Sequence, residues 1–231
     1  MTDHGRQSGG YLAAPDTGAC GGQQADAIRS AVSSYYTQKV AEHGATAKGV
    51  DWNSVESQEL RFTQLTKIIS CRSGFSVNDY GCGYGALVPF LAKRFSSFQY
   101  CGFDWSERMI AEANRLYKDL PGCRFVAGKE LTQVADYTIA SGIFNVKLDQ
   151  PETVWQQYVV DTVHKLDGLS KAGFSFNILT SYSDPEYKRG DLFYADPCWF
   201  FDYCKRHISR QVALLHDYGL YEFTILVRKE V

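Results

Sequence analysis

The most constraining feature of the sequence is a run of glycines that follows a short apolar stretch. Phe75 to Tyr80 has the pattern of a buried β-strand, and its end runs into Asp79-Tyr80-Gly81-Cys82-Gly83-Tyr84-Gly85. A helix is expected over residues 84–95, directly after the glycines. Glycines at such a turn allow positive φ and let a ligand approach the backbone closely. The helix behind them would offer unpaired N–H groups. This arrangement predicts a ligand-binding loop in an α/β fold.

Strand-like and helical stretches alternate after the glycine run. Such alternation is typical of a parallel sheet covered by helices on both faces. Further strands are expected over residues 98–104, 123–127, 135–141 and 173–179, and helices over 106–117 and 151–166.

The end of the chain has a different pattern. A short helix at 199–206 precedes two strand-like runs, 211–216 and 220–228, joined by a short turn. So short a turn permits only antiparallel pairing, so the sheet should finish with an antiparallel hairpin.

The N-terminal part lacks this alternation. Residues 1–24 are rich in Gly, Ser, Gln and Ala, which predicts a mobile tail. Helices are expected over residues 25–42 and after Asn53, where Glu56 completes a capping-box pattern. We therefore expect a helical extension or lid at 25–73 and an α/β domain at 74–231, with an aromatic insert at about 180–207.

Composition excludes several classes of protein. The 231 residues carry a net charge of −2 without a dense basic run, so duplex nucleic acid is an unsuitable substrate. The seven cysteines form no Cys-x-x-Cys pair, which predicts free thiols and no metal site. No signal-peptide pattern and no apolar run of about 20 residues is present, so a soluble cytoplasmic protein without a membrane partner is expected. Oligomeric state is left open.

The glycine run is compatible with two adenosine cofactors. Gly81, Gly83 and Ala86 fit the Gly-x-Gly-x-x-Ala variant of the dinucleotide fingerprint, and Asp104 could hold the ribose of either cofactor. Asp79 favours S-adenosylmethionine (SAM), because a carboxylate there would repel a pyrophosphate and attract an ammonium group. The terminal hairpin also favours SAM, because dinucleotide-binding domains do not need it. An NAD(P)-dependent oxidoreductase and a non-catalytic SAM-binding or scaffold protein remain the alternatives.

These motifs resemble those of the class I SAM-dependent methyltransferases. Residues 79–85 match the first motif of that family, 100–106 the second and 135–145 the fourth, and the resemblance covers residues 74–231. It implies a doubly wound, mostly parallel seven-stranded sheet of order 3-2-1-4-5-7-6 with strand 7 antiparallel. It also implies SAM as the cofactor and S-adenosylhomocysteine (SAH) as the product.

The resemblance also suggests which residues bind the cofactor. The third motif departs from the family pattern, because Gly128 is followed by Lys129 and then Glu130, which could substitute as the adenine ligand. Trp105 and Met109 could flank the adenine or pack against the second helix. Arg61 or Lys39 could reach the cofactor carboxylate. The candidate cofactor-binding residues are Asp79, Gly81, Cys82, Gly83, Gly85, Asp104, Trp105, Met109, Gly128, Lys129, Glu130, Ser141 and Arg61.

The acceptor side is less determined. Methyl transfer is a direct displacement, so positioning supplies much of the acceleration, and a base is needed only if the nucleophile loses a proton. His216 is a candidate base, because an imidazole exchanges protons near neutral pH. His43 and Tyr194 are further candidates. The aromatic insert could wall a small-molecule pocket or form a satellite core. We expect transfer to a small molecule at oxygen or nitrogen.

Overall fold

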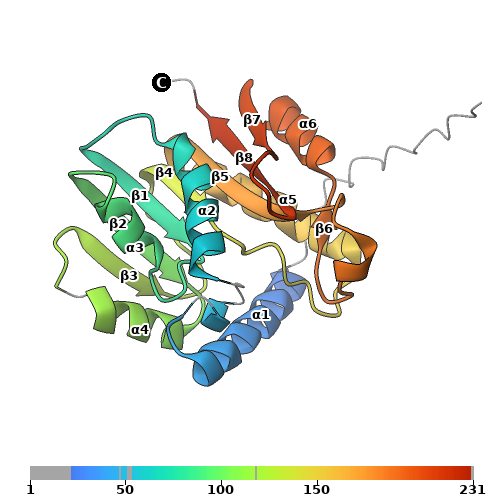
Figure 1. The fold of residues 1–231 in the computed structure, drawn as a ribbon, viewed down its shortest axis with the longest axis horizontal. Helices are drawn as coiled ribbons and strands as arrows, with labels where there is room; N and C mark the ends of the chain where they lie inside the picture. Colours follow the sequence, from blue (N-terminus) through green and yellow to red (C-terminus); the bar gives the residue numbers. More distant parts are fainter. Residues whose placement is uncertain (1–21, 47, 51–53, 118, 230–231) are drawn as a thin grey trace, which may run out of the picture.

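A central β-sheet dominates the computed structural model, which describes residues 22–46, 48–50, 54–117 and 119–229 (Figure 1). The strands follow one another in space as β3-β2-β1-β4-β5-β8-β7, and β6 pairs with the end of β5 beside this path. With the two-residue β6 set aside, the predicted order 3-2-1-4-5-7-6 is confirmed. The strands are β1 (Phe75–Tyr80), β2 (Phe98–Asp104), β3 (Cys123–Ala127), β4 (Ala135–Ala140), β5 (Ser170–Thr180), β6 (Tyr194–Ala195), β7 (Gln211–Leu215) and β8 (Glu222–Arg228).

Strand β8 runs against its neighbours. It pairs antiparallel with β5, from Gly173↔Arg228 to Leu179↔Glu222, and antiparallel with β7. The pairs β1–β2, β1–β4, β2–β3 and β4–β5 are parallel. The predicted antiparallel hairpin at the end of the sheet is therefore confirmed.

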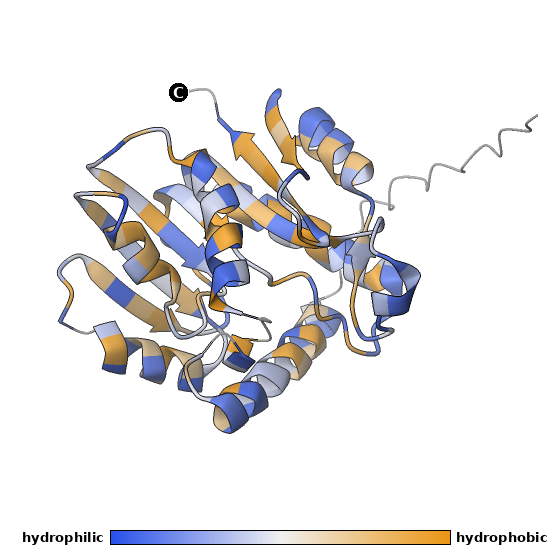
Figure 2. Ribbon diagram, in the orientation of Figure 1, coloured by the Kyte–Doolittle hydropathy of each residue, from blue (hydrophilic) through white to orange (hydrophobic). Residues whose placement is uncertain are grey.

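Helices pack on both faces of the sheet, and α1 lies beside α4 (Figure 1). The helices are α1 (Gly22–His43), α2 (Val55–Leu65), α3 (Leu87–Ala92), α4 (Glu107–Tyr117), α5 (Glu152–Gly168) and α6 (Pro197–His207), with short 3-10 helices η1 (Lys48–Val50), η2 (Thr66–Ile68) and η3 (Pro185–Tyr187). Figure 2 shows apolar residues along most of the strands and interrupted bands of them on the helices.

Two apolar cores fill the space between the helices and the sheet. Along β5, Phe174, Phe176 and Ile178 belong to the core that also holds Trp155 of α5. The second core packs residues of α2 and α3, including Phe62 and Phe90, against β1 and β2. Because strand side chains alternate between faces, the intervening β5 residues point toward this second side.

The intervening residues of β5 are polar, and one of them fastens the N-terminal extension to the sheet. Buried Ser175 donates a hydrogen bond to the Leu65 carbonyl at 2.9 Å. Arg228 at the end of β8 donates to the Lys67 carbonyl, also at 2.9 Å. The end of α2 and the turn after it therefore dock on β5 and β8 through hydrogen bonds as well as through apolar packing.

Element boundaries differ from the predictions, notably in α1, α2 and α3. Helix α1 begins at Gly22, inside the expected tail, whose residues 1–21 lie outside the described part of the chain. Helix α3 spans Leu87–Ala92 instead of 84–95, because the preceding glycines hold a turn. The expected cap Asn53 is not among the described residues. Helix α2 is capped by Ser54, which accepts from Ser57 N at 3.1 Å.

Three further predictions concern thiols, metals and membranes. The described cysteines are free thiols, namely Cys71, Cys82, Cys101, Cys123, Cys198 and Cys204. Across the described ranges, no group of three or more His, Cys, Asp or Glu side chains is arranged to hold a metal ion. None of the helices in those ranges has the length and apolar character needed to cross a bilayer.

Candidate functional site

A first cavity lies where β1, β2 and β4 end, which is where ligands bind in parallel α/β sheets. The glycine loop and the residues that follow these strands line it, and Val32, Ser33 and Tyr36 of α1 cover it. The cavity brings together most of the predicted cofactor-binding residues, namely Asp79, Gly81, Cys82, Gly83, Asp104, Trp105, Met109 and Ser141.

Close packing determines the shape of the glycine loop. Gly81 has a φ of 82°, and a Cβ on it would lie 2.3 Å from Ile143 Cγ2. The N–H groups of Gly81 and Cys82 both donate to the Phe103 carbonyl, at 2.8 and 2.9 Å. The loop is thus hydrogen-bonded to the end of β2 and pressed against the loop after β4. A larger residue than glycine would push these two loops apart.

Asp104 connects the end of β2 to the glycine loop. Its Oδ2 accepts from Gly83 N and its Oδ1 accepts from Ser106 N, each at 2.9 Å. Burial raises the pKa of Asp104, although these backbone hydrogen bonds oppose that shift. A carboxylate has about four lone-pair sites, so both oxygens can still accept hydrogen bonds from a ligand.

Asp79 is a buried carboxyl group near the end of β1, just before the glycine loop. Tyr100 donates its hydroxyl hydrogen to Asp79 Oδ2 at 2.6 Å. Burial raises the pKa of Asp79 to about 7; the Tyr100 hydrogen bond opposes this shift and the nearby Asp104 adds to it. Asp79 therefore changes its charge near neutral pH, in a cavity wall where a cationic ligand would favour the ionised form.

Two buried polar atoms in the wall of this cavity have no hydrogen-bond partner among the residues that the structure describes. They are Trp105 Nε1 and Ser141 Oγ, which come from the residues after β2 and β4. An unpaired buried donor costs about 1–3 kcal/mol, so such groups in a cavity wall indicate a ligand that pairs with them. The first cavity therefore fits a ligand with one hydrogen-bond acceptor near the carboxyl end of β2 and another near the carboxyl end of β4.

A second cavity adjoins the first. Its volume is about 470 Å³, within the range of about 300–1,000 Å³ that is typical of small-molecule sites. Tyr36, Val50 and Gly142 line both cavities. The remaining lining residues of the second cavity are Arg61, Asn145, Val146, Leu179, Ser183, Tyr187, Arg189, Leu192, Tyr194, Tyr221 and Glu222.

A buried polar network forms one wall of the second cavity. Arg61 Nε donates to both oxygens of Glu222, at 2.8 and 2.9 Å, and Nη2 donates to Oε1 at 2.5 Å. Asn177 Nδ2 donates to Glu222 Oε2 at 2.5 Å. Asn177 Oδ1 accepts from Gly142 N at 2.8 Å. Glu222 is 1% exposed and Asn177 is fully buried.

Several predicted cofactor ligands lie outside the first cavity. A Cβ on Gly85 would lie 2.9 Å from Phe125 Cε1, so Gly85 allows close packing there. Gly128, Lys129 and Glu130 are exposed and do not line the cavity. Arg61 is held by Glu222 in the wall of the second cavity. Close packing accounts for Gly85 and the ion pair for Arg61, whereas the cofactor contacts of Gly128, Lys129 and Glu130 stay a prediction.

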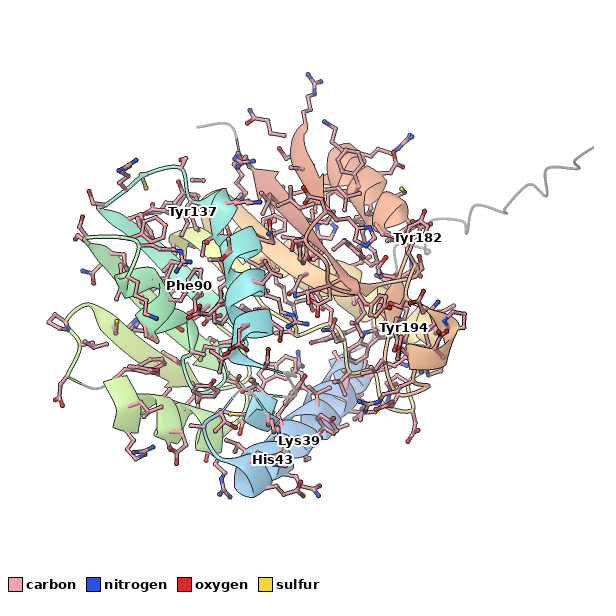
Figure 3. The ribbon with its side chains drawn as sticks, viewed as in Figure 1. Lys39, His43, Phe90, Tyr137, Tyr182 and Tyr194 are labelled. Atoms are coloured by element: carbon pink, nitrogen blue, oxygen red, sulfur yellow. The ribbon has the colours of Figure 1, made fainter. Side chains whose placement is uncertain are left out.

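The catalytic candidates are separated in space. Figure 3 shows His43 at the end of α1, far from Tyr194 on β6. His216 stacks obliquely on Tyr182, with ring centroids 5.9 Å apart, and neither histidine lines either cavity. Tyr194 lines the second cavity, and its hydroxyl accepts from Arg189 N at 3.0 Å. Of the three candidates, Tyr194 is the one positioned to contact a bound molecule.

Sequence reasoning did not identify the network residues Asn177, Glu222 and Gly142 as a unit. A signal was present, because Asn177 interrupts an apolar strand and Glu222 begins another. Buried polar side chains in strand patterns need partners. The pattern alone does not say which distant residue supplies them.

Comparisons with known proteins agree with this architecture. A family model described as a methyltransferase domain matches residues 77–158. A Mycobacterium tuberculosis (strain ATCC 25618 / H37Rv) relative named as a methyltransferase, Rv1506c, is 49% identical over 163 residues, which cover 71% of this chain and 98% of that protein.

Solved structures resemble the chain at the level of the fold. Magnesium protoporphyrin IX methyltransferase from Synechocystis PCC 6803 with bound SAM has a TM-score of 0.57 and 16% identity, covering 95% of this chain and 100% of that one. Phosphoethanolamine N-methyltransferase 1 of Haemonchus contortus, in complex with phosphoethanolamine and SAH, has a TM-score of 0.61 and 9% identity, covering 89% and 50%.

The raised pKa of Asp79 predicts a pH-dependent stability. Protonated Asp79 favours the folded state, so its contribution is complete below the ordinary pKa of 3.8 and is lost as the pH rises through about 7. The unfolding free energy of the wild type, minus that of Asp79→Asn, should fall by about 3–4 kcal/mol between pH 4 and pH 7.5. Urea unfolding of both proteins at four pH values measures this difference in unfolding free energy.

Asp136→Asn is a matched control for this slope. Burial alone would raise the pKa of Asp136, but two hydrogen bonds from Ser76 and the nearby charge of Lys171 together lower it. Its contribution should therefore stay constant between pH 4.5 and 7.5. If the difference in unfolding free energy between wild type and Asp79→Asn is equally independent of pH, the predicted ionisation of Asp79 is wrong.

Proposed function

The chain belongs to the class I SAM-dependent methyltransferases, and from this premise we propose that it methylates a small-molecule acceptor at oxygen or nitrogen. In this proposal the first cavity holds SAM and the second holds the acceptor. The proposal rests on two buried donors, Trp105 Nε1 and Ser141 Oγ, which no described residue pairs with. They lie in a cavity that also contains the glycine loop and Asp104.

The residues of the first cavity fit the chemical parts of the cofactor. Asp104 can accept hydrogen bonds from ribose hydroxyls while it holds Gly83. Trp105 and Met109 can flank the adenine. Ionised Asp79 favours the cationic amino-acid end. When bound, SAM supplies an electrophilic methyl group on a sulfonium.

The wall that the two cavities share at Gly142 supports methyl transfer from SAM in the first cavity to an acceptor in the second. A molecule in the second cavity would meet the cofactor beside the loop after β4, since Gly142 borders both spaces. Direct displacement needs the acceptor atom in line behind the methyl carbon, and two adjoining cavities can enforce that geometry.

The charges of the second cavity support an acceptor without a strong net charge. Arg61 is paired with Glu222, and Arg189 is paired with Asp191. Tyr36, Tyr187, Tyr194 and Tyr221 contribute flat apolar faces with polar tips, which suit a ring-containing molecule of modest polarity.

The Ser141→Ala variant tests the cofactor assignment. It should leave the free protein as stable as the wild type or more stable by about 1 kcal/mol, because it removes an unpaired buried hydroxyl. It should also weaken SAH binding by about three- to tenfold, because a hydrogen bond to the ligand is lost. Unfolding and titration calorimetry measure the two effects.

Ser175→Ala is the matched control, since its buried hydroxyl already donates to the Leu65 carbonyl. It should cost about 1–2 kcal/mol of stability and leave SAH affinity unchanged. If Ser141→Ala destabilises the free protein and binds SAH normally, the proposed contact is wrong.

Ligand-induced stabilisation tests the choice of cofactor. SAH at 100 times its dissociation constant should stabilise the protein by about 2.7 kcal/mol. The Asp104→Ala variant should lose at least about tenfold in SAH affinity, since charge-assisted hydrogen bonds to the ribose are removed. Thermal unfolding with SAM, SAH, NAD and NADP measures both effects.

Asp136→Ala controls for lost backbone contacts, because Asp136 accepts hydrogen bonds from Ser76 at the opposite end of the strands. Stabilisation by NADP alone would contradict the assignment to SAM. Transfer of label from SAM to a metabolite in a cell extract would separate an enzyme from a SAM-binding scaffold.

A further inference from the structure

We propose that Glu222 is a positioning residue for methyl transfer, which acts through Asn177 on the backbone between the two cavities. The inference rests on the proposed function, because it takes the first cavity as the cofactor site. Glu222 itself lines the second cavity and lies outside the lining of the first. Its effect on the cofactor must therefore pass through other residues.

The first step is the fixed orientation of the Glu222 carboxylate. Glu222 is 1% exposed, and the Arg61 guanidinium contacts both of its oxygens. Such forked contacts restrict a carboxylate to one orientation. One oxygen, Oε2, also receives the Asn177 amide.

The second step is the orientation of the Asn177 amide. An ionised carboxylate can only accept hydrogen bonds, so the Asn177 nitrogen must face Glu222. The Asn177 oxygen then faces the opposite way, where it accepts from Gly142 N at 2.8 Å. Gly142 N–H can only donate, so it also requires the Asn177 oxygen, and the two partners together fix the amide. The Glu222 carboxylate thus strengthens the amide orientation that holds Gly142.

The third step leads from Gly142 to the glycine loop. Gly142 has a φ of 72° and borders both cavities, and its neighbours Ser141 and Ile143 line the first cavity. Ile143 packs so closely on Gly81 that a Cβ there would lie 2.3 Å from Ile143 Cγ2. A displacement of Gly142 would therefore move the wall that the cofactor contacts.

The Arg61–Glu222 pair could act on the site simply by stabilising the fold, and this effect differs from the proposed positioning of Gly142. The Arg61–Glu222 pair also joins α2 to β8, so its loss would destabilise the protein irrespective of any positioning effect. Asn177 separates the two explanations, because its side-chain hydrogen bonds to described residues go to Glu222 and Gly142. Asn177→Leu keeps the number and branching of the side-chain heavy atoms, breaks the connection and retains both partners of the ion pair.

The experiment compares Asn177→Leu with the wild type by two readouts. Exchange of the Gly142 amide hydrogen, followed by NMR in the cofactor-free protein, should accelerate at least about tenfold. The dissociation constant for SAH, measured by calorimetry, should rise about three- to tenfold. Glu222→Gln should change both readouts in the same direction, although Glu222 contacts neither Gly142 nor the first cavity.

Thr224→Val is the matched control. Thr224 is fully buried two residues further along β8, and its hydroxyl is paired with that of Tyr218 at 2.9 Å. This variant should lose stability but keep wild-type exchange at Gly142 and wild-type SAH affinity. If it changes both readouts as much as Asn177→Leu does, the effect is a general loss of stability and the proposal is overturned.

Two further results separate a failure of this proposal from a failure of the proposed function. Wild-type exchange at Gly142 in Asn177→Leu overturns the proposal, whether or not Glu222→Gln folds. Should the wild type bind neither SAM nor SAH, the proposed function fails, whereas the exchange measurement still tests the connection from Glu222 to Gly142.

Discussion

The close approach of Gly81 to Ile143 is the constraint on which the candidate site depends. It brings the turn after β1 against the loop after β4, and the same turn is hydrogen-bonded to Phe103 at the end of β2. Three strand ends are thereby joined around one cavity. Neighbouring strands supply Asp104, Trp105 and Ser141 to its wall. A side chain at residue 81 would separate these loops, so the missing Cβ determines the shape of the whole site.

Buried charge is the second organising feature. A buried ion pair contributes little net stability compared with apolar packing, whereas removal of one partner costs about 3–5 kcal/mol. The Arg61–Glu222 pair joins α2 of the N-terminal extension to β8 of the sheet. Their position in the wall of the second cavity gives the pair a second consequence, because Asn177 connects it to Gly142. The docking of α2 and the geometry between the cavities thus depend on the same carboxylate.

Much of the α/β domain could be predicted from the sequence. The bounds of β1, β2 and β3 agree with the expected ranges, because apolar periodicity and turn residues are local signals. The helix after the glycine loop is shorter than expected, since positive φ at Gly83 and Gly85 keeps the chain in a turn. The same local signals identified Asp79 and Asp104, which the first cavity contains.

Local patterns determined the succession of strands and helices, the glycine turn and the expected position of the cavity, because periodicity and turn chemistry act over short stretches of chain. The strand order followed from the resemblance to the class I SAM-dependent methyltransferases. The tertiary structure alone decided which distant groups meet. Arg61 and Glu222 are 161 positions apart, and nothing in either segment names the other as its partner. Tyr36 covers both cavities because α1 packs over the strand ends. Long-range packing selects such contacts, so the acceptor side of the site could be described only from the folded chain.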